Sequence, residues 1–390
     1  MSGAAAVLYS SVGNELTRYE IDPDEATLTR RETVRLPANV QYVWPHPSKR
    51  YLYVASSPRG PGGKPVNDHH LTAFRIDPQA GALQQHGAAT LLPHRPIHMS
   101  LDRSGKFALI AYSEPRALTV HRLNEDGTIG AQVEQPSDLD TGIYAHQILA
   151  APSNRTTILV TRGHDATAAK AEDPGALKVF DFNDGVLSNR ASIAPGGGFG
   201  FGPRHIDFHP TKPWVYVSLE RQNRLQLFTL EGDTPSAAPR FTKELLENPQ
   251  DKHPRQLGST VHVHPNGRFV YVANRADHEV EHEGKRVFGG GENSIAVFAI
   301  DPATGEPTLI QHIDPQSVHV RTFAFDPSGR VMVAASIKSI DVREGATLRN
   351  VPAALSVFRV GEDGKLTFAR KYDVETGGRY QFWMGIVGLR

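Results

Sequence analysis

Four polar residues stand where apolar strands begin or end, and their side chains suit acid–base chemistry on an anion. Glu220 directly follows the apolar run WVYVSL and Arg275 ends the run FVYVANR, whereas His146 and Arg204 come just before two other apolar runs. A charge that faces a buried channel is costly unless it is paired or used, so these positions favour a functional interpretation over structural ion pairs. A carboxylate and an imidazole can move protons, and a guanidinium binds carboxylate or phosphate through two parallel hydrogen bonds.

A repeat of short hairpins would bring these positions together. One pattern recurs six times: an apolar strand, a turn rich in Pro, Gly and Asn, and a second strand rich in Val and Tyr, as in VHVHPNGRFVYVANR. Aligned on the turn, the copies are separated by 56, 49, 58, 55 and 62 residues. A third strand and a less regular fourth segment follow most hairpins, and four strands per unit are typical of a β-propeller blade.

The two ends of the chain supply a seventh unit. The N-terminal segments AAAVLYSS, NELTRYEIDPD and LTRRETVRL fit three outer strands that have no inner strand before them. The apolar segment QFWMGIVGL, from Gln381 to Leu389, has the character of that missing inner strand. Pairing of the two ends would close the ring and leave no unpaired edge. The sequence therefore predicts an all-β fold in which residues 1–390 form a single seven-bladed β-propeller domain, with four antiparallel strands per blade.

The composition limits the partners of the protein. The chain has 42 basic and 42 acidic residues, so no net field favours nucleic acid or an anionic membrane. It has no cysteine, which excludes disulfides, thiolate chemistry and Cys-ligated metals. The N-terminus lacks the pattern of a signal peptide, and no segment approaches the ~18 apolar residues of a membrane span. We expect a cytoplasmic protein that binds a small molecule, without a nucleic-acid or membrane partner, and leave its oligomeric state open.

Strand direction sorts the other histidines and arginines between the two faces of the disc. In each hairpin the start of the first strand lies beside the end of the second, so residues at these points share one mouth of the central channel. The four residues above are expected there, together with His98, His205, His262 and Arg321. Three histidines of His-Pro turns are expected at the opposite face in structural positions: His46, His209 and His264.

Long insertions follow the second strands and are expected on the same face as the polar group. They begin at Pro58, Gly163, Ala276 and Ile337. Irregular loops over a rigid scaffold are typical of a binding or catalytic surface. The segment GGGFGFGPRH adds backbone that can approach a ligand, but a strand rather than a helix follows it, which excludes a dinucleotide fingerprint. Only the stretch FTKELLENPQ shows helical periodicity.

The segments GPRHIDFHPTKPWVYVSLE, VHVHPNGRFVYVANR and NSIAVFAID resemble the lactonase family of seven-bladed propellers. This family includes bacterial 6-phosphogluconolactonases and the fungal enzyme that lactonises 3-carboxy-cis,cis-muconate. The resemblance covers nearly the whole chain and implies a polar site at His146, Arg204, Glu220 and Arg275, the residues that strand direction already groups. The second strands end differently from those of phosphogluconolactonase-like members, for example at Ala335-Ser336, which leaves the substrate open.

The resemblance implies hydrolysis of a sugar-acid or related carboxylated or phosphorylated lactone. Such a reaction needs an activated water, a stabilised tetrahedral oxyanion and a proton for the leaving alkoxide. We expect Glu220 to be the general base and His146 the acid, with these two roles interchangeable. Arg204 and Arg275 are expected to bind the substrate anion and the oxyanion. No cofactor is expected.

Further substrate contacts are expected from His98, His205 and Arg321, although His205 would equally suit a structural position between blades. The same site would serve the lactonisation or cycloisomerisation of an unsaturated dicarboxylic acid. A non-catalytic propeller that binds a protein or peptide would instead expose an apolar rim. A metal ion held by His146, His164, Asp165 and Glu220 is a weaker alternative, because too few carboxylates are placed near the channel.

Overall fold

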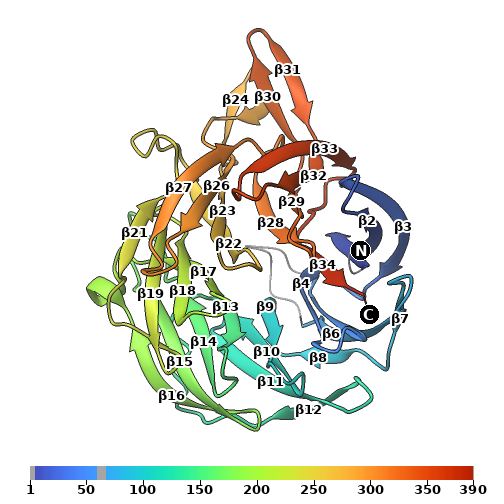
Figure 1. Ribbon diagram of the computed structural model, residues 1–390, viewed down its shortest axis with the longest axis vertical. Coiled ribbons are helices and arrows are strands. Elements are labelled where there is room, and N and C mark those ends of the chain that lie inside the picture. Colours follow the sequence, from blue (N-terminus) through green and yellow to red (C-terminus); the bar gives the residue numbers. More distant parts are fainter. Residues whose placement is uncertain (1–4, 59–66, 390) are drawn as a thin grey trace.

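The computed structural model describes residues 5–58 and 67–389 and shows a ring of β-sheets. Within these residues, seven antiparallel sheets of four or five strands surround a central channel (Figure 1). Successive sheets follow one another along the chain, and we number them blade 1 to blade 7. The predicted seven-bladed β-propeller is confirmed. Among the described residues no helix is long and apolar enough to span a membrane.

The strands of each blade are stacked outwards from the channel, and the innermost strand is named first. Blade 1 consists of β34 (Met384–Gly388), β1 (Ala6–Val12), β2 (Glu15–Asp22) and β3 (Thr27–Arg35). Blade 2 consists of β4 (Val40–Pro45), β5 (Tyr51–Ser56), β6 (His69–Ile76) and β7 (Leu83–Gln85), with β8 (Thr90–Leu92) also paired to β6. Blade 3 consists of β9 (Pro96–Leu101), β10 (Phe107–Tyr112), β11 (Ala117–Leu123) and β12 (Ile129–Val133). Blade 4 consists of β13 (Ala145–Ala150), β14 (Thr156–Thr161), β15 (Ala176–Asn183) and β16 (Val186–Ile193).

The remaining three blades complete the ring. Blade 5 consists of β17 (Pro203–Phe208), β18 (Trp214–Leu219), β19 (Arg224–Glu231) and β21 (Phe241–Glu244), with β20 (Thr234–Pro235) paired to β19. Blade 6 consists of β22 (Leu257–Val263), β23 (Phe269–Arg275), β26 (Ser294–Ile300) and β27 (Pro307–Ile313). Blade 7 consists of β28 (Val320–Phe325), β29 (Val331–Ser336), β32 (Ala353–Val360) and β33 (Leu366–Val374). A short 3-10 helix, η1 (Pro195–Gly198), precedes blade 5.

Repeated side-chain hydrogen bonds join each blade to the next. Tyrosine hydroxyls of second strands donate to carbonyls of turn glycines in the following blade, as Tyr216 does to Gly305 at 2.8 Å. The His-Pro histidines act in the same way, and His209 Nε2 donates to the carbonyl of Gly267 at 2.8 Å. Gly267 has a φ of +70°, and a Cβ there would lie 2.7 Å from the His209 ring, so only glycine fits. His46 and His264 make equivalent bonds, which agrees with the structural position expected for these histidines.

The ring closes through the two ends of the chain. Strand β34 pairs antiparallel with β1, from Ala6 opposite Gly388 to Ser10 opposite Met384. Gln381 ties this closure to blade 7, because its amide donates to the carbonyls of Ser336 at 2.8 Å and Ala354 at 3.0 Å. The predicted closure is therefore confirmed, with the inner strand running from Met384 to Gly388.

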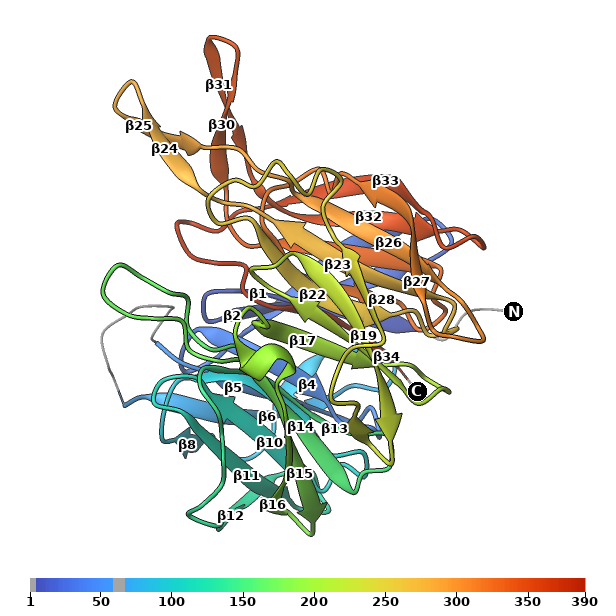
Figure 2. The ribbon, with the colours of Figure 1, turned by 90° about the vertical axis from the view of Figure 1, so that its left-hand side faces the viewer.

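Two insertions and one stretch with helical periodicity differ from expectation. The insertions that begin at Ala276 and Ile337 are not irregular loops: they form the hairpins β24 (Glu279–His282) with β25 (Lys285–Phe288), and β30 (Ile340–Glu344) with β31 (Thr347–Val351). Both hairpins project from the same face of the disc and lie side by side (Figure 2). The stretch FTKELLENPQ contributes strand β21 instead of a helix, because residues 241–244 pair with the edge of β19. Most of the insertion that begins at Pro58 lies outside the described residues.

Candidate active site

The ends of inner and second strands meet at one mouth of the channel. His146 and Arg204 are the second residues of β13 and β17, Glu220 directly follows β18, and Arg275 ends β23. A cavity of about 320 Å³ lies at this mouth. His146, Glu220 and Arg275 line it directly, and Arg204 is buried behind Glu220. The four residues predicted to lie together are thus neighbours in space.

The Glu220 carboxylate is held by three arginines. Arg204 Nε donates to Oε1 at 3.2 Å, Arg275 Nη2 donates to the same oxygen, and Arg162 Nη1 donates to Oε2. The Glu220 side chain is only 3% exposed. Burial alone would raise the pKa of Glu220, but the positive charges of Arg275, Arg162 and Arg204 outweigh it and hold that pKa far below the usual range. Glu220 is therefore a fixed anion at neutral pH.

Arg162 belongs to this group but was not among the residues predicted from sequence. It directly follows β14, just as Arg275 closes β23, so its signal was the same: an arginine after an apolar second strand. Its guanidinium carbon also lies 4.6 Å from the centre of the Tyr144 ring, which fixes the side chain against the cavity wall.

His146 is a buried neutral imidazole beside this anion. Burial, followed by the nearby charge of Arg204, holds the pKa of His146 well below its usual value. Within the described chain, its Nδ1 is buried without a hydrogen-bond partner. Glu220 acts in the opposite direction on this pKa, since its negative charge favours the protonated ring. The imidazole is thus neutral at rest, with a counter-charge nearby for its protonated form.

A second carboxylate of the cavity wall acts on Arg275 through a histidine. Arg275 Nη1 donates to His319 Nε2 at 3.0 Å, and His319 Nδ1 lies 3.2 Å from Asp277 Oδ2. Arg255 Nε donates to the other oxygen of Asp277 at 2.6 Å. Burial lowers the pKa of His319 to about 4, so the ring is neutral and can accept from Arg275. Neither Asp277 nor His319 was predicted from the sequence, although both lie within two residues of a predicted arginine.

Arg321 lines the cavity, but two other residues predicted to contact substrate do not. His98 and His205 lie in the channel outside the cavity lining, with their ring centres 6.0 Å apart. His98 packs against Tyr42, and His205 lies 5.2 Å from His146, measured between ring centres. Burial lowers the pKa of both histidines, so both rings are neutral and lie in the channel next to the cavity. His262, also expected at this mouth, lies beside Asp207 instead of lining the cavity.

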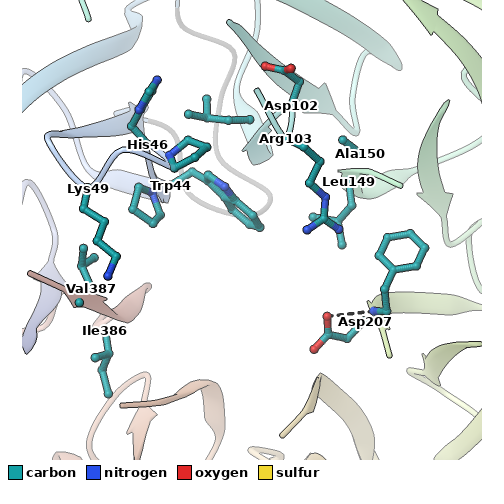
Figure 3. Close-up of a pocket in the computed structure, with 15 residues that line it drawn as sticks. Trp44, His46, Lys49, Asp102, Arg103, Leu149, Ala150, Asp207, Ile386 and Val387 are labelled. Carbon is teal, nitrogen blue, oxygen red and sulfur yellow. Dashed lines mark hydrogen bonds between the residues drawn. The ribbon is translucent and has the colours of Figure 1, made fainter. Parts of the chain in front are cut away.

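A second concavity, of about 490 Å³, lies at the opposite mouth of the channel (Figure 3). Its two carboxylates accept hydrogen bonds from backbone amides. Asp102 accepts from the backbone amides of Ser104, Lys106 and Phe107, and Asp207 accepts from the amide of Val263 at 2.8 Å. No histidine–carboxylate–arginine group like that around Glu220 is found among the described residues that line this pocket, so the candidate active site is the smaller cavity.

The residues considered for a metal ion have other partners. His164 lies against Asp173 and Glu114, and Asp165 is paired with Arg221. Across the described ranges, no three or more His, Cys, Asp or Glu side chains are grouped as metal ligands would be.

The fold and the cavity together define a propeller with buried imidazole, carboxylate and guanidinium groups at one channel mouth. The family described as "Lactonase, 7-bladed beta-propeller" matches residues 5–344, and the chain belongs to that family. It is similar to the 6-phosphogluconolactonase of Bacillus subtilis (strain 168), with 27% identity over 371 residues that cover 90% of this chain and 94% of the relative. The 6-phosphogluconolactonase of Enterobacter sp. (strain 638) is 28% identical over 316 residues, which cover 81% of this chain and 83% of the relative.

Solved structures support the same fold. The periplasmic gluconolactonase of Pseudomonas aeruginosa superimposes with a TM-score of 0.72 at 20% identity, covering 99% of this chain and all of that chain. A protein from Lactobacillus plantarum gives a TM-score of 0.72 at 19% identity, with 98% of this chain and 99% of that chain covered. At these identities the likeness concerns the fold alone.

Proposed function

We propose that the protein hydrolyses the lactone of a sugar acid or a related anionic lactone at the cavity of Glu220. The observation that carries this proposal is that a neutral, buried His146 and the Glu220 carboxylate, which three arginines keep ionised, line the same cavity. The family and the 6-phosphogluconolactonases among its relatives support the same class of reaction.

Of the two candidate bases, His146 is the better one. The ion pairs of Glu220 lower its affinity for a proton, so a water proton would gain little by moving to it. The imidazole of His146 is neutral and can accept that proton, and Glu220 then stabilises the imidazolium. This differs from the roles first expected from sequence: His146 acts first as the base and then as the acid, and Glu220 anchors the arginines and supplies the counter-charge.

The reaction then proceeds through one tetrahedral intermediate. His146 removes a proton from water as its oxygen attacks the lactone carbonyl, and the guanidinium of Arg275 or Arg162 stabilises the oxyanion. The intermediate collapses with cleavage of the ring C–O bond, and the leaving alkoxide takes the proton from the imidazolium. Lactone and water thus become a hydroxy acid, which releases one proton as it ionises at neutral pH.

Proton release from a panel of fresh lactones tests this function. The panel contains glucono-δ-lactone, 6-phosphogluconolactone and muconate-type acids, each corrected for its uncatalysed reaction. We expect the wild-type protein to hydrolyse at least one lactone, and His146→Gln to lose ~10²–10⁴-fold in kcat. His164→Gln, a half-exposed histidine outside the cavity lining, is the matched control. Equal rates for wild type and His146→Gln would reject the mechanism. Proton uptake with the muconate-type acids alone would favour a cycloisomerase, because closing a lactone from a dicarboxylate consumes one proton.

A further inference from the structure

A second, smaller cavity adjoins the candidate active site beside blades 1 and 2, and we name it the side cavity. Its volume is about 280 Å³. Tyr380 and Phe382, in the segment that leads into β34, line both cavities, so the two cavities meet at these rings. The rest of its lining comes from the β1–β2 turn, the start of blade 2 and the segment before β34, and includes Gly13, Asn39 and Arg379. One molecule can therefore extend from the active site past Tyr380 into the side cavity.

The side cavity differs from the active-site cavity in charge. Among the described residues, Arg379 is the one charged residue in its lining. The charge of Arg379 already has partners, because Nη2 donates to Glu15 Oε2 at 3.2 Å and Nε donates to the Thr376 carbonyl at 3.3 Å. The active-site cavity, in contrast, is lined by six arginine or lysine side chains. The side cavity therefore suits an uncharged part of a ligand.

Tyr380 presents an aromatic ring at the boundary of the two cavities. The residue is 47% exposed, whereas Phe382 beside it is buried. The Tyr380 carbonyl accepts from the Gly13 amide at 3.0 Å, which fixes the backbone at this point. A large aromatic side chain left exposed beside a cavity is typical of a surface that a ligand covers. The C–H face of a sugar ring is apolar and packs on such a ring.

Asn39 supplies hydrogen-bonding groups to the same cavity. Its carbonyl accepts from the Ser57 amide at 2.8 Å and from Gln41 Nε2 at 3.1 Å, so its backbone is also fixed. Within the described chain, the side-chain amide of Asn39 forms no hydrogen bond. An amide both donates and accepts, and it therefore matches a hydroxyl group. An alkyl chain would cover the Tyr380 ring but leave this amide unpaired, which is unfavourable.

We propose that the side cavity is a subsite for a second, neutral sugar unit, so that the substrate is the lactone of a sugar acid that carries a glycosyl group. This inference rests on the proposed function, which places the lactone ring beside His146 and Glu220. The sugar unit packs on Tyr380, and its hydroxyls bind the amide of Asn39. The two cavities together give room for a disaccharide.

Calorimetric binding of open-chain acids tests the subsite. Gluconate has a single sugar unit, maltobionate and lactobionate carry a hexose on O4, and melibionate carries one on O6. We expect the wild-type protein to bind the best of the three glycosylated acids about 10-fold more tightly than gluconate, because that acid gains a hydrogen bond and a ring contact. The preferred acid identifies the linkage. Tyr380→Ala should reduce the preference to about 3-fold or less, and Asn39→Ala should also reduce it.

Phe199→Ala is the matched control, because Phe199 is also an exposed aromatic residue but lines neither cavity. It should leave the preference unchanged. Equal affinity of the wild-type protein for all four acids, or an unchanged preference in Tyr380→Ala, would overturn the subsite. Tighter binding of 6-O-hexylgluconate than of every glycosylated acid would also overturn it, since the side cavity would then take an apolar chain.

Lactone turnover is measured separately, so that the two proposals can fail independently. Turnover of glucono-δ-lactone without a preference for glycosylated acids leaves the proposed function intact and rejects the subsite. The preference without turnover of any lactone rejects the proposed function alone. The wild-type comparison does not depend on the folding of any variant.

Discussion

At the level of single residues, Glu220 is the carboxylate of the cavity that is paired with three arginines. Glu220→Gln removes the negative charge that three buried or half-buried arginines share. Removing one partner from a buried ion pair costs ~3–5 kcal/mol, so we expect a lower thermal midpoint as well as a kcat reduced by ~100-fold or more. Glu114→Gln, which alters an exposed pair with His164, is the control and should change the midpoint little. A stable, fully active Glu220→Gln protein would contradict the anchoring role.

The pH dependence of kcat distinguishes the two roles of His146. As a base, His146 acts in its neutral form, and its lowered pKa keeps it neutral well below the ordinary value of ~6.5. We therefore expect kcat to be flat from pH 8 to about 6.5 and to fall only at more acidic pH, when the ring becomes protonated. A kcat that declines as the pH rises through this range would instead assign the acid role to His146. Proton-release assays, corrected for spontaneous hydrolysis, measure kcat over the whole pH range.

Sequence reasoning reached those site residues whose position is fixed by strand direction. His146, Arg204, Glu220 and Arg275 were predictable because the ends of paired strands must be neighbours. Asp277 and His319 were not, because their approach depends on loop conformation: His319 has a φ of +62°, a backbone state that no local pattern indicated. His98 was predicted at the cavity but is buried in the channel outside the cavity lining. A position near the start of a strand does not specify how deep in the channel the side chain lies.

At the level of elements, Asp277 fastens the root of the β24–β25 hairpin to blade 7. It contacts His319 and Arg255, and Lys338 bridges it to Glu279. The pKa of Asp277 is lowered, since His319 and Arg255 outweigh its burial, so its stabilisation is present above the unfolded value of ~3.9 and is lost as the pH falls. We expect Asp277→Asn to reduce hydrogen-exchange protection in residues 279–288 at neutral pH. Glu344→Gln, at the tip of the other hairpin, should leave that protection unchanged, and an unchanged Asp277→Asn protein would refute the anchor.

The elements that sequence reasoning missed are those that depend on partners far along the chain. The insertions after β23 and β29 lack the strong apolar alternation of the blades, and their hairpins lie against each other, β25 beside β30. The segment before Leu245 has helical spacing, but the free edge of β19 pairs with it and makes it strand β21. Tertiary pairing overrides local propensity in both cases.

At the level of the whole molecule, the seven-bladed ring was predictable from two features of the sequence. Six hairpins recur at regular spacing, and the C-terminal segment has the character of the inner strand that the N-terminal strands lack. Every blade depends on its two neighbours, through contacts such as the Tyr216–Gly305 and His209–Gly267 hydrogen bonds. In a closed ring every blade is stabilised by both of its neighbours. We therefore expect the pairing of β34 with β1 to contribute as much to the stability of the ring as the contacts between any two other blades.

This equivalence leads to a prediction about where the chain can be cut. A protein that ends at Tyr380 lacks β34, leaves the inner edge of β1 unpaired, and should lose cooperative thermal unfolding and aggregate. A circular permutant that joins the old ends with a short linker and opens the chain between Glu283 and Gly284 keeps all seven blades, because these residues form the exposed tip of the β24–β25 hairpin. The first and last described residues are adjacent, with the Leu389 amide donating to the Ala5 carbonyl at 2.6 Å. We expect the permutant to unfold in one transition close to that of the wild type by calorimetry. If the permutant and the truncated protein were equally unstable, chain connectivity rather than the β34–β1 pairing would hold the ring closed.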